Sequence, residues 1–138
     1  MSSRRHHVLI VDDDAVLLEL IGMIMEQLSE GRWEVHTAST PQAALDLLER
    51  QPVEMVVADV CMPGAGGLGF IREVRQRYPR LMIVAISGDT PPGREEACLR
   101  NGATLFLEKP RSGDGWLAIY AILQERLRLA EEAAQAEG

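Results

Sequence analysis

The 138-residue sequence has little of several features that mark specialised classes of protein. It has two cysteines, too few for the disulfide framework of a small secreted domain, and no cysteine and histidine cluster of the kind that binds a metal. No apolar run approaches the ~20 residues that a membrane-spanning helix needs. The first seven residues, MSSRRHH, lack the apolar core of a secretory signal. A cytoplasmic protein is therefore predicted.

Basic charge is also scarce. The 14 lysines and arginines face 21 aspartates and glutamates, which gives a formal net charge of −7. Nucleic-acid phosphates repel such a chain, so direct binding to nucleic acid is not expected. Lys109 is the single lysine, against thirteen arginines. His6 and His7 follow two arginines, and we expect residues 1–7 to be a solvated leader without a metal.

What the chain does contain is an alternation of short apolar runs and amphipathic segments. Runs of this kind are typical of strands buried on both faces. They occupy residues 8–11, 33–37, 53–59, 81–87 and 104–108. Apolar residues at helical spacing lie between them and after the last, in 17–28, 44–48, 68–78, 94–100 and 116–127. The alternation predicts an α/β fold with a parallel sheet covered on both faces.

The segments that join these elements are short, so a single domain over residues 8–128 is expected. Asp14 and the Ser-Thr-Pro of residues 39–41 are predicted to begin two of the helices. The glycine-rich stretch 62–67 must be a loop. Residues 129–138, rich in alanine and glutamate, are expected to extend the last helix or to fray.

Polar residues stand where the predicted strands end. In an open parallel sheet, ligands bind outside the carboxyl ends of the strands, so these residues are expected to share one crevice. They are Asp12, Asp13 and Asp14 after the first strand, Asp59 after the third, Ser87 after the fourth, and Glu108 and Lys109 after the fifth.

This set suits phosphoryl chemistry. Carboxylates held close together repel one another unless a cation lies between them, and Mg²⁺ prefers oxygen ligands. Asp12 and Asp13 would flank the ion, and Asp59 would complete its carboxylates. A carboxylate beside Mg²⁺ can attack phosphorus and form an acyl phosphate. The ammonium of Lys109 can follow a moving phosphoryl oxygen better than the rigid fork of arginine, and Ser87 offers a hydroxyl.

Each of these features taken singly has a plainer explanation. An acidic run before a helix serves capping, a strand-end serine is usually structural, and a lysine before proline is usually solvated. Their placement together on one edge is what indicates a site.

Four segments carry a family resemblance. VLIVDDD (8–14), VVADVCMPG (56–64), AISG (85–88) and GATLFLEKP (102–110) resemble the motifs of the receiver domains of bacterial two-component response regulators. The likeness runs from about residue 8 to about residue 127. It implies the flavodoxin-like (βα)5 fold with strand order 2-1-3-4-5. It also implies phosphorylation by a sensor histidine kinase or a histidine phosphotransfer protein.

The resemblance also implies roles for single residues. Asp59 would accept the phosphoryl group. Mg²⁺, or Mn²⁺, would be held by Asp13, Asp59 and the main-chain carbonyl of Cys61. Ser87 and Phe106 would form a switch that alters a partner-binding face made by the fourth helix, the fifth strand and the fifth helix.

Two further implications concern the surroundings of the phosphoacceptor. Cys61 and Asp89 stand at positions that tune the lifetime of the phosphoryl group. A cis peptide between Lys109 and Pro110 would aim the lysine inward. Gly66 stands where the family often has an aspartate.

Several functions remain open at this point. The chain can be a stand-alone module, or the receiver of a longer regulator whose output domain lies elsewhere. A Mg²⁺-dependent phosphatase for a small substrate would need a second aspartate at the position of Cys61, and a receiver that is never phosphorylated would not need all five polar residues. A module that catalyses only its own phosphorylation and dephosphorylation is expected.

Overall fold

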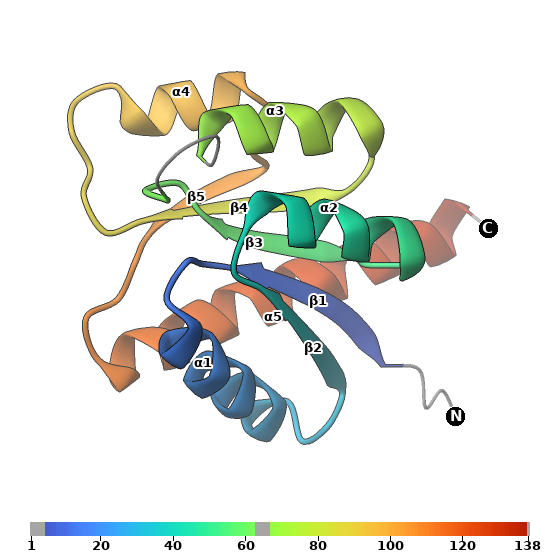
Figure 1. The fold of residues 1–138 in the computed structure, drawn as a ribbon. Helices are drawn as coiled ribbons and strands as arrows, with labels where there is room; N and C mark the ends of the chain where they lie inside the picture. The colour runs from blue at the N-terminus through green and yellow to red at the C-terminus, as the bar shows by residue number, and fades with distance from the viewer. Residues whose placement is uncertain (1–4, 63–66, 138) are drawn as a thin grey trace.

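The structure, a computed structural model, describes residues 5–62 and 67–137. Pro63, Gly64, Ala65 and Gly66, within the predicted loop, lie outside the described residues. Strands and helices alternate along the chain (Figure 1). The strands are β1 (His6–Val11), β2 (Trp33–Ala38), β3 (Met55–Asp59), β4 (Met82–Ser87) and β5 (Leu105–Glu108). The helices are α1 (Ala15–Leu28), α2 (Pro41–Arg50), α3 (Leu68–Arg77), α4 (Arg94–Arg100) and α5 (Gly113–Glu137).

The five strands form one parallel sheet in the order β2-β1-β3-β4-β5. This confirms the predicted flavodoxin-like fold. Val8 of β1 pairs with Val35 of β2 and with Met55 of β3. Because the strands run parallel from this shared level, their carboxyl ends lie at one common edge. The crossover helices bring each strand back in the same direction, and the polar residues that follow the strands are therefore brought to the same side.

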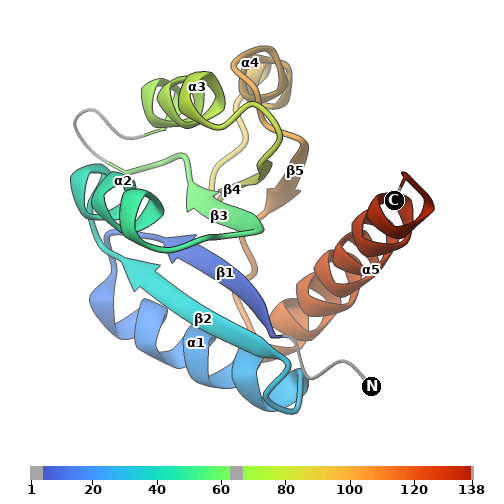
Figure 2. The ribbon, with the colours of Figure 1, turned by 90° about the vertical axis from the view of Figure 1, so that its right-hand side faces the viewer.

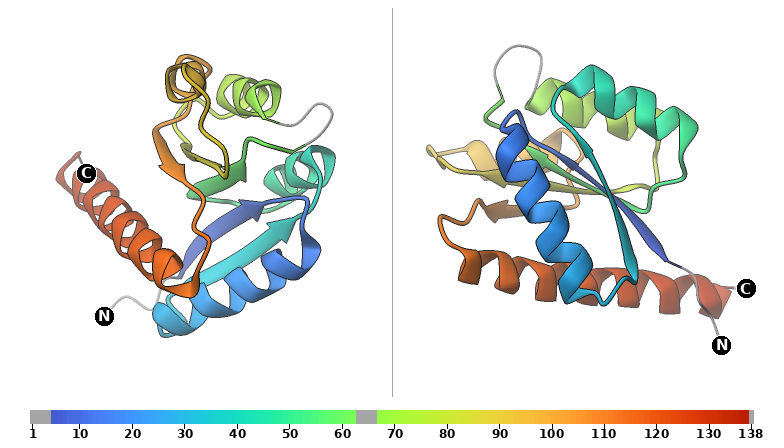
Figure 3. Two further views of the ribbon diagram at one scale, coloured as in Figure 1. Left: turned by 90° about the vertical axis from the view of Figure 1, so that its left-hand side faces the viewer. Right: turned by 60° about the horizontal axis from the view of Figure 1, so that its bottom comes forward.

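Helices cover both faces of the sheet (Figures 2 and 3). On one face, α1 and α5 pack over Val8, Ile10 and the alternate residues of β3 and β4. On the other face, α2, α3 and α4 pack over Leu9, Val11 and their neighbours. The strands β1, β3 and β4 are buried from both sides, which is why they read as continuous apolar runs.

The predicted helix starts are confirmed. The Asp14 side chain accepts a hydrogen bond from the Leu17 N–H at 3.1 Å, and Thr40 does the same for Ala43 at 3.1 Å. Helix α3 begins after Gly67, whose φ is +70°. A Cβ there would lie 2.7 Å from the carbonyl oxygen of Val60, so only glycine allows this close approach beside the end of β3.

The expectation for His6 and His7 was wrong. Strand β1 begins at His6, two residues earlier than predicted, and pairs His6 with Trp33 and His7 with Glu34. The His6 imidazole meets Glu54 at 2.6 Å and His7 meets His36 at 3.0 Å, so both rings gain polar partners that the sequence order does not reveal.

At the other end of the chain, α5 continues to Glu137, so residues 129–137 are helical. Within the described ranges, none of the helices has both the length and the apolar character that crossing a membrane requires.

Candidate functional site

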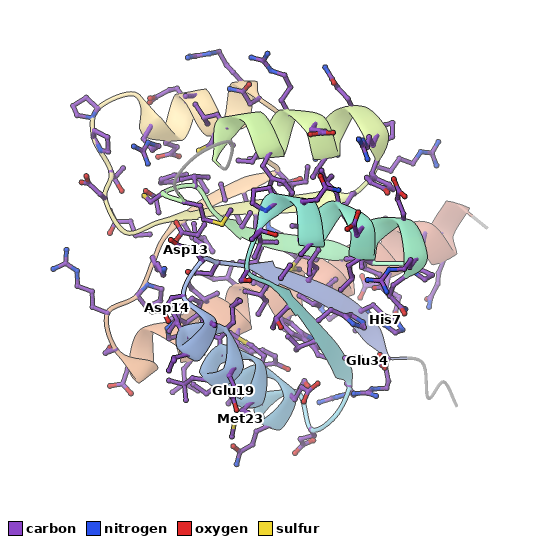
Figure 4. All side chains as sticks on the ribbon, viewed as in Figure 1. His7, Asp13, Asp14, Glu19, Met23 and Glu34 are labelled. Atoms are coloured by element: carbon purple, nitrogen blue, oxygen red, sulfur yellow. The ribbon has the colours of Figure 1, made fainter. Side chains whose placement is uncertain are left out.

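Three aspartates meet at the carboxyl edge of the sheet. Asp12 follows β1 and is fully buried, Asp59 ends β3 and is 4% exposed, and Asp13 lies exposed beside them. One carboxylate oxygen from each lies within 4.8 Å of the others. Figure 4 shows Asp13 and Asp14 where β1 gives way to α1. The sheet register therefore brings together carboxylates separated by 46 to 47 positions in the chain.

Lys109 lies over two of these carboxylates. Its Nζ is 2.5 Å from Asp12 Oδ2 and 3.1 Å from Asp59 Oδ2. Burial opposes the charge on the ammonium, but the contacts with both aspartates outweigh it and raise the Lys109 pKa above its ordinary value. The lysine is therefore a fixed positive charge at neutral pH.

The implied cis peptide before Pro110 is absent: the Lys109–Pro110 bond is trans. Trans is the isomer that X–Pro bonds favour by about 0.5–1 kcal/mol. The main-chain N–H of Lys109 donates to the carbonyl of Ser87 at 2.8 Å, which anchors the residue at the end of β5. From there the long side chain reaches the carboxylates without the cis turn.

Asp12 has one satisfied and one unsatisfied oxygen. Oδ1 accepts a hydrogen bond from the Asp14 N–H at 2.9 Å. Oδ2 is buried and close to Lys109, but the pair is a contact of charges without an aligned hydrogen bond. Burial raises the pKa of Asp12, against the lowering effect of Lys109, and the charge of Asp59 raises it further. Carboxylates gathered in one place raise one another's pKa unless a cation lies between them, so the three aspartates together favour a bound cation.

Asp59 is held in place by its own loop. Its Oδ1 accepts a hydrogen bond from the Cys61 N–H at 2.8 Å, and its Oδ2 faces Lys109. A hard divalent ion takes carboxylate and main-chain carbonyl oxygens together with water. Asp12, Asp13, Asp59 and the Cys61 carbonyl are such a donor set, so the residues present fit a hard ion.

Ser87, at the end of β4, is 1% exposed. Its hydroxyl donates to the main-chain carbonyl of Asp89, and it lies 3.3 Å from the thiol of Cys61. Nη1 of Arg94, the first residue of α4, lies 3.3 Å from both the Ser87 hydroxyl and the Cys61 sulfur. Sequence reasoning missed Arg94, because no motif distinguishes it from the other arginines.

The surroundings of Cys61 alter its thiol. Burial would raise its pKa, but hydrogen bonds with Ser87, Arg94 and main-chain N–H groups outweigh burial and lower it. Of the two residues expected to tune phosphoryl lifetime, Cys61 contacts Ser87 through its side chain, whereas Asp89 contacts it through its main-chain carbonyl and keeps its side chain exposed.

The remaining expected residue, Phe106, is half-buried in β5. It packs against the core that lies beneath α2, α3 and α4. Between β4, β5 and the following loops is a cavity of about 370 Å³, lined by Ser87, Gly88, Asp89, Thr90, Glu108, Lys109 and Arg111. The structure thus brings Asp12, Asp13 and Asp59 together and places Lys109 on two of them. Ser87 and Phe106 make their contacts elsewhere, with the Asp89 carbonyl and with the core.

The chain resembles known proteins in sequence. The family model of the response regulator receiver domain matches residues 8–119. The transcriptional regulatory protein FixJ of Bradyrhizobium diazoefficiens is 32% identical over 133 residues, which are 95% of this chain and 61% of FixJ.

Solved structures agree on the fold. A CheY-like receiver domain protein from Methanospirillum hungatei superposes with a TM-score of 0.77 at 22% identity, over 97% of this chain and 99% of that one. A response regulator from Burkholderia pseudomallei, solved with a phosphorylated aspartic acid and a calcium ion, has a TM-score of 0.71 at 21% identity, over 91% and 74%. The chain spans 16% to 61% of the length of eight curated relatives that it matches.

Proposed function

Because the chain belongs to the response regulator receiver family of two-component systems, we propose that it receives a phosphoryl group on Asp59 from a histidine kinase or a histidine phosphotransfer protein. The observation that carries the proposal is the position of the Lys109 ammonium, 2.5 Å from Asp12 and 3.1 Å from Asp59. The ammonium lies beside Asp59, where it can offset the negative charge of an incoming phosphoryl group.

The proposed step is an in-line transfer. A carboxylate oxygen of Asp59 forms a bond to phosphorus while the bond from phosphorus to the donor imidazole nitrogen breaks. The donor ring carries a proton on its other nitrogen, so it keeps the electron pair of the broken bond and leaves as a neutral imidazole. The phosphoryl group arrives with its negative charge beside Lys109, whose ammonium can turn from Asp59 toward a phosphoryl oxygen. The chain catalyses only this reaction and the hydrolysis that reverses its effect, so it is not an enzyme for other substrates.

A divalent ion belongs to the proposal, with Mg²⁺, or Mn²⁺, as the ion in the cell. Asp12, Asp13, Asp59 and the Cys61 carbonyl would hold it, and it would offset the charge of the transferred group. Two observations support this. The oxygens of the three carboxylates lie within 4.8 Å of one another, and the structure of the Burkholderia fold neighbour contains both a phosphorylated aspartic acid and a calcium ion.

Intact-mass measurement tests the proposal. After incubation with Mg²⁺ and acetyl phosphate, the mass of the wild-type chain should rise by one phosphoryl group, and Asp59→Asn should remain unmodified. Asp46→Asn, an exposed aspartate on α2 that hydrogen-bonds Gln42, is the matched control and should behave as wild type. Modification of Asp59→Asn to the same extent would refute the assignment.

The phosphorylated state is proposed to change the face formed by α4, β5 and α5. Ser87 would leave the Asp89 carbonyl and donate to the phosphoryl group, and Phe106 would turn into the space behind it. Leu99 on α4 and Leu117 on α5 are 43% and 48% exposed, which gives this face apolar contacts for a partner protein. Amide chemical-shift changes on phosphorylation should concentrate in these elements; changes confined to α1 and α2 would contradict the switch.

Cys61 and Asp89 are proposed to tune how long the acyl phosphate lasts. The Cys61 thiol is exposed and lies 3.3 Å from the Ser87 hydroxyl, which is proposed to bind the phosphoryl group. Decay of the phosphorylated protein can be followed in Cys61→Asn and Asp89→Ala. Wild-type rates in both would remove this role.

A second candidate is a receiver module within a longer regulator. The fraction of each curated relative that the chain spans favours it, since most of their length lies outside the matched region. The phosphoryl chemistry would be the same, and the coding sequence beyond Gly138 distinguishes the two. In both cases we propose a cytoplasmic module. Its net charge of −7 favours action through proteins over direct contact with nucleic acid.

A further inference from the structure

A second group of metal-ligand side chains lies at the other end of β1, far from the aspartates. His7 comes from β1, and Glu34 and His36 come from the neighbouring edge strand β2. Glu34 lies opposite His7 in the register, and His36 is two residues further along, so all three side chains point to the same face of the sheet. Figure 4 shows His7 and Glu34 side by side at the end of the sheet opposite Asp13.

The donor atoms of this cluster face one another. His7 Nδ1 lies 3.0 Å from His36 Nε2, and Glu34 Oε2 lies 3.8 Å from the first nitrogen and 3.5 Å from the second. The two rings are nearly parallel, with 14° between their planes and 5.3 Å between their centroids, so it is the ring nitrogens that meet. Two imidazole nitrogens in this position need a proton or a cation between them.

The three separations fit a small divalent ion. Atoms spaced in this way lie on a circle of radius about 2.0 Å, which is the length of a Zn–N or Zn–O bond. An ion close to the centre of the triangle would therefore touch all three donors once the two rings rotate, because in this structure their nitrogens face each other. The Glu34 oxygen is too distant from either nitrogen for a good hydrogen bond, so the triangle is more open than hydrogen bonding requires.

Neighbouring residues hold the donors in these positions. Arg5 Nη1 pairs with the other carboxylate oxygen of Glu34 at 3.1 Å, which leaves Oε2 turned toward the rings. The side-chain amide nitrogen of Gln51, at the end of α2, lies 3.2 Å from His7 Nδ1, in keeping with an unprotonated nitrogen there. Burial lowers the pKa of His36 below its ordinary value, against the charge of Glu34. Support of this kind orients ligands in metal sites.

The cluster is also open to solvent. The side chains of His7, Glu34 and His36 are 28%, 36% and 17% exposed, so an ion can enter and a water molecule can occupy a fourth position. Two imidazoles and one carboxylate are a borderline donor set, which suits zinc and similar transition metals. Hard Mg²⁺ prefers the all-oxygen pocket at the opposite edge.

We propose that His7, Glu34 and His36 form a binding site for a divalent transition-metal ion, with zinc as the ion it takes. Three protein ligands and one water complete a tetrahedral coordination. The bound ion joins β1 to the edge strand β2 at the amino end of the sheet. The site is independent of phosphorylation and would exist whether or not Asp59 is modified.

Zinc titration of the whole chain, in competition with a chromophoric zinc chelator and with Mg²⁺ in excess, tests the proposal. Wild type should bind one zinc ion, and His7→Gln and His36→Gln should each lose at least about 100-fold in affinity, since even supporting residues of metal sites are worth 10- to 100-fold. Glu34→Gln, which keeps the shape of the side chain, should lose about tenfold.

His6→Gln is the matched control, because His6 is adjacent in sequence but points to the other face, toward Glu54 and Glu131. It should bind zinc as wild type does. Cobalt(II) in place of zinc should give the strong visible bands of a four-coordinate ion in wild type and lose them in His36→Gln. Wild-type zinc affinity in His36→Gln, or an equal loss in His6→Gln, would overturn the site and leave the His7–His36 contact as a hydrogen bond.

Discussion

The two ends of strand β1 carry two clusters of ligand-type side chains that differ in almost every physical respect. At the carboxyl end, Asp12 and Asp59 are buried oxygen donors paired with Lys109. At the amino end, His7 and His36 are half-buried nitrogen donors. The first cluster is anionic and suits a hard ion and phosphate, and the second is close to neutral and suits a borderline metal.

The difference comes from how each end is built. Residues beyond the carboxyl ends of parallel strands leave the sheet and enter loops, where they can converge on a crevice. Residues within β1 and β2 stay in the ladder, so His7 and His36 meet only because the two strands lie side by side in one register. At one end of the sheet, the site is formed by residues at or just beyond the strand ends, which meet in a crevice. At the other end, the proposed site is formed by residues of two neighbouring strands.

The largest effect on the phosphorylation rate is expected from a substitution at the carboxyl end, at Lys109. Lys109→Met should slow phosphorylation of the chain by acetyl phosphate about 100-fold, because it removes the cation that stabilises the transferred group. Arg111→Met is the control, since Arg111 lines the same cavity with an exposed side chain. Intact-mass time courses measure both rates. A Lys109→Met rate equal to wild type would place the lysine outside the chemistry.

A smaller effect is expected at Ser87. Ser87→Ala should still accept a phosphoryl group, but about tenfold more slowly, because one hydrogen bond to the charged group is lost. Thr90→Val, in the same loop, removes an exposed hydroxyl and should leave the rate unchanged. Equal rates for Ser87→Ala and wild type would mean that the hydroxyl stays with the Asp89 carbonyl throughout.

The acidic end should also show in stability against pH. The Asp12 pKa is raised above 3.8 in the folded protein, chiefly by burial. Asp12 therefore favours folding most below pH 3.8, and this contribution is lost as pH rises through its raised pKa. In urea unfolding without divalent ions, the free energy of unfolding of Asp12→Asn should increase relative to that of wild type as pH rises. Added Mg²⁺ should reverse this difference, because it stabilises the wild-type protein. A difference that stays constant with pH would contradict this.

The smallest effect is expected when a change at the amino end of β1 is measured by the phosphorylation rate at the carboxyl end. Positions 7 and 12 are separated by roughly 16 Å along a strand, more than the distance over which salt screens exposed charges. His36→Gln, with or without zinc, should therefore change the phosphorylation rate by less than about twofold. A larger change, measured by the same mass time course, would mean that the two ends communicate through β1.

Most of the fold was predictable from the sequence because its signals are local. Apolar runs such as VLIV predict the strands. Asp14 and Thr40 predict the starts of α1 and α2, and in the structure each caps its helix. The acidic site was predictable for a related reason: residues that end parallel strands must meet. Arg94 was not predictable, because its contact with Ser87 depends on where α4 begins after a loop.

The sequence by itself therefore determined the order of strands and helices, the buried runs and the meeting of Asp12, Asp59 and Lys109 at one edge. Only the tertiary structure decided the pairing of His7 with Glu34 and His36, the trans peptide before Pro110 and the turn of Ser87 toward Asp89. The reason is physical. Periodicity and caps act within one segment, whereas side-chain contacts between segments depend on register, side-chain reach and local packing, which exist only once the chain has folded.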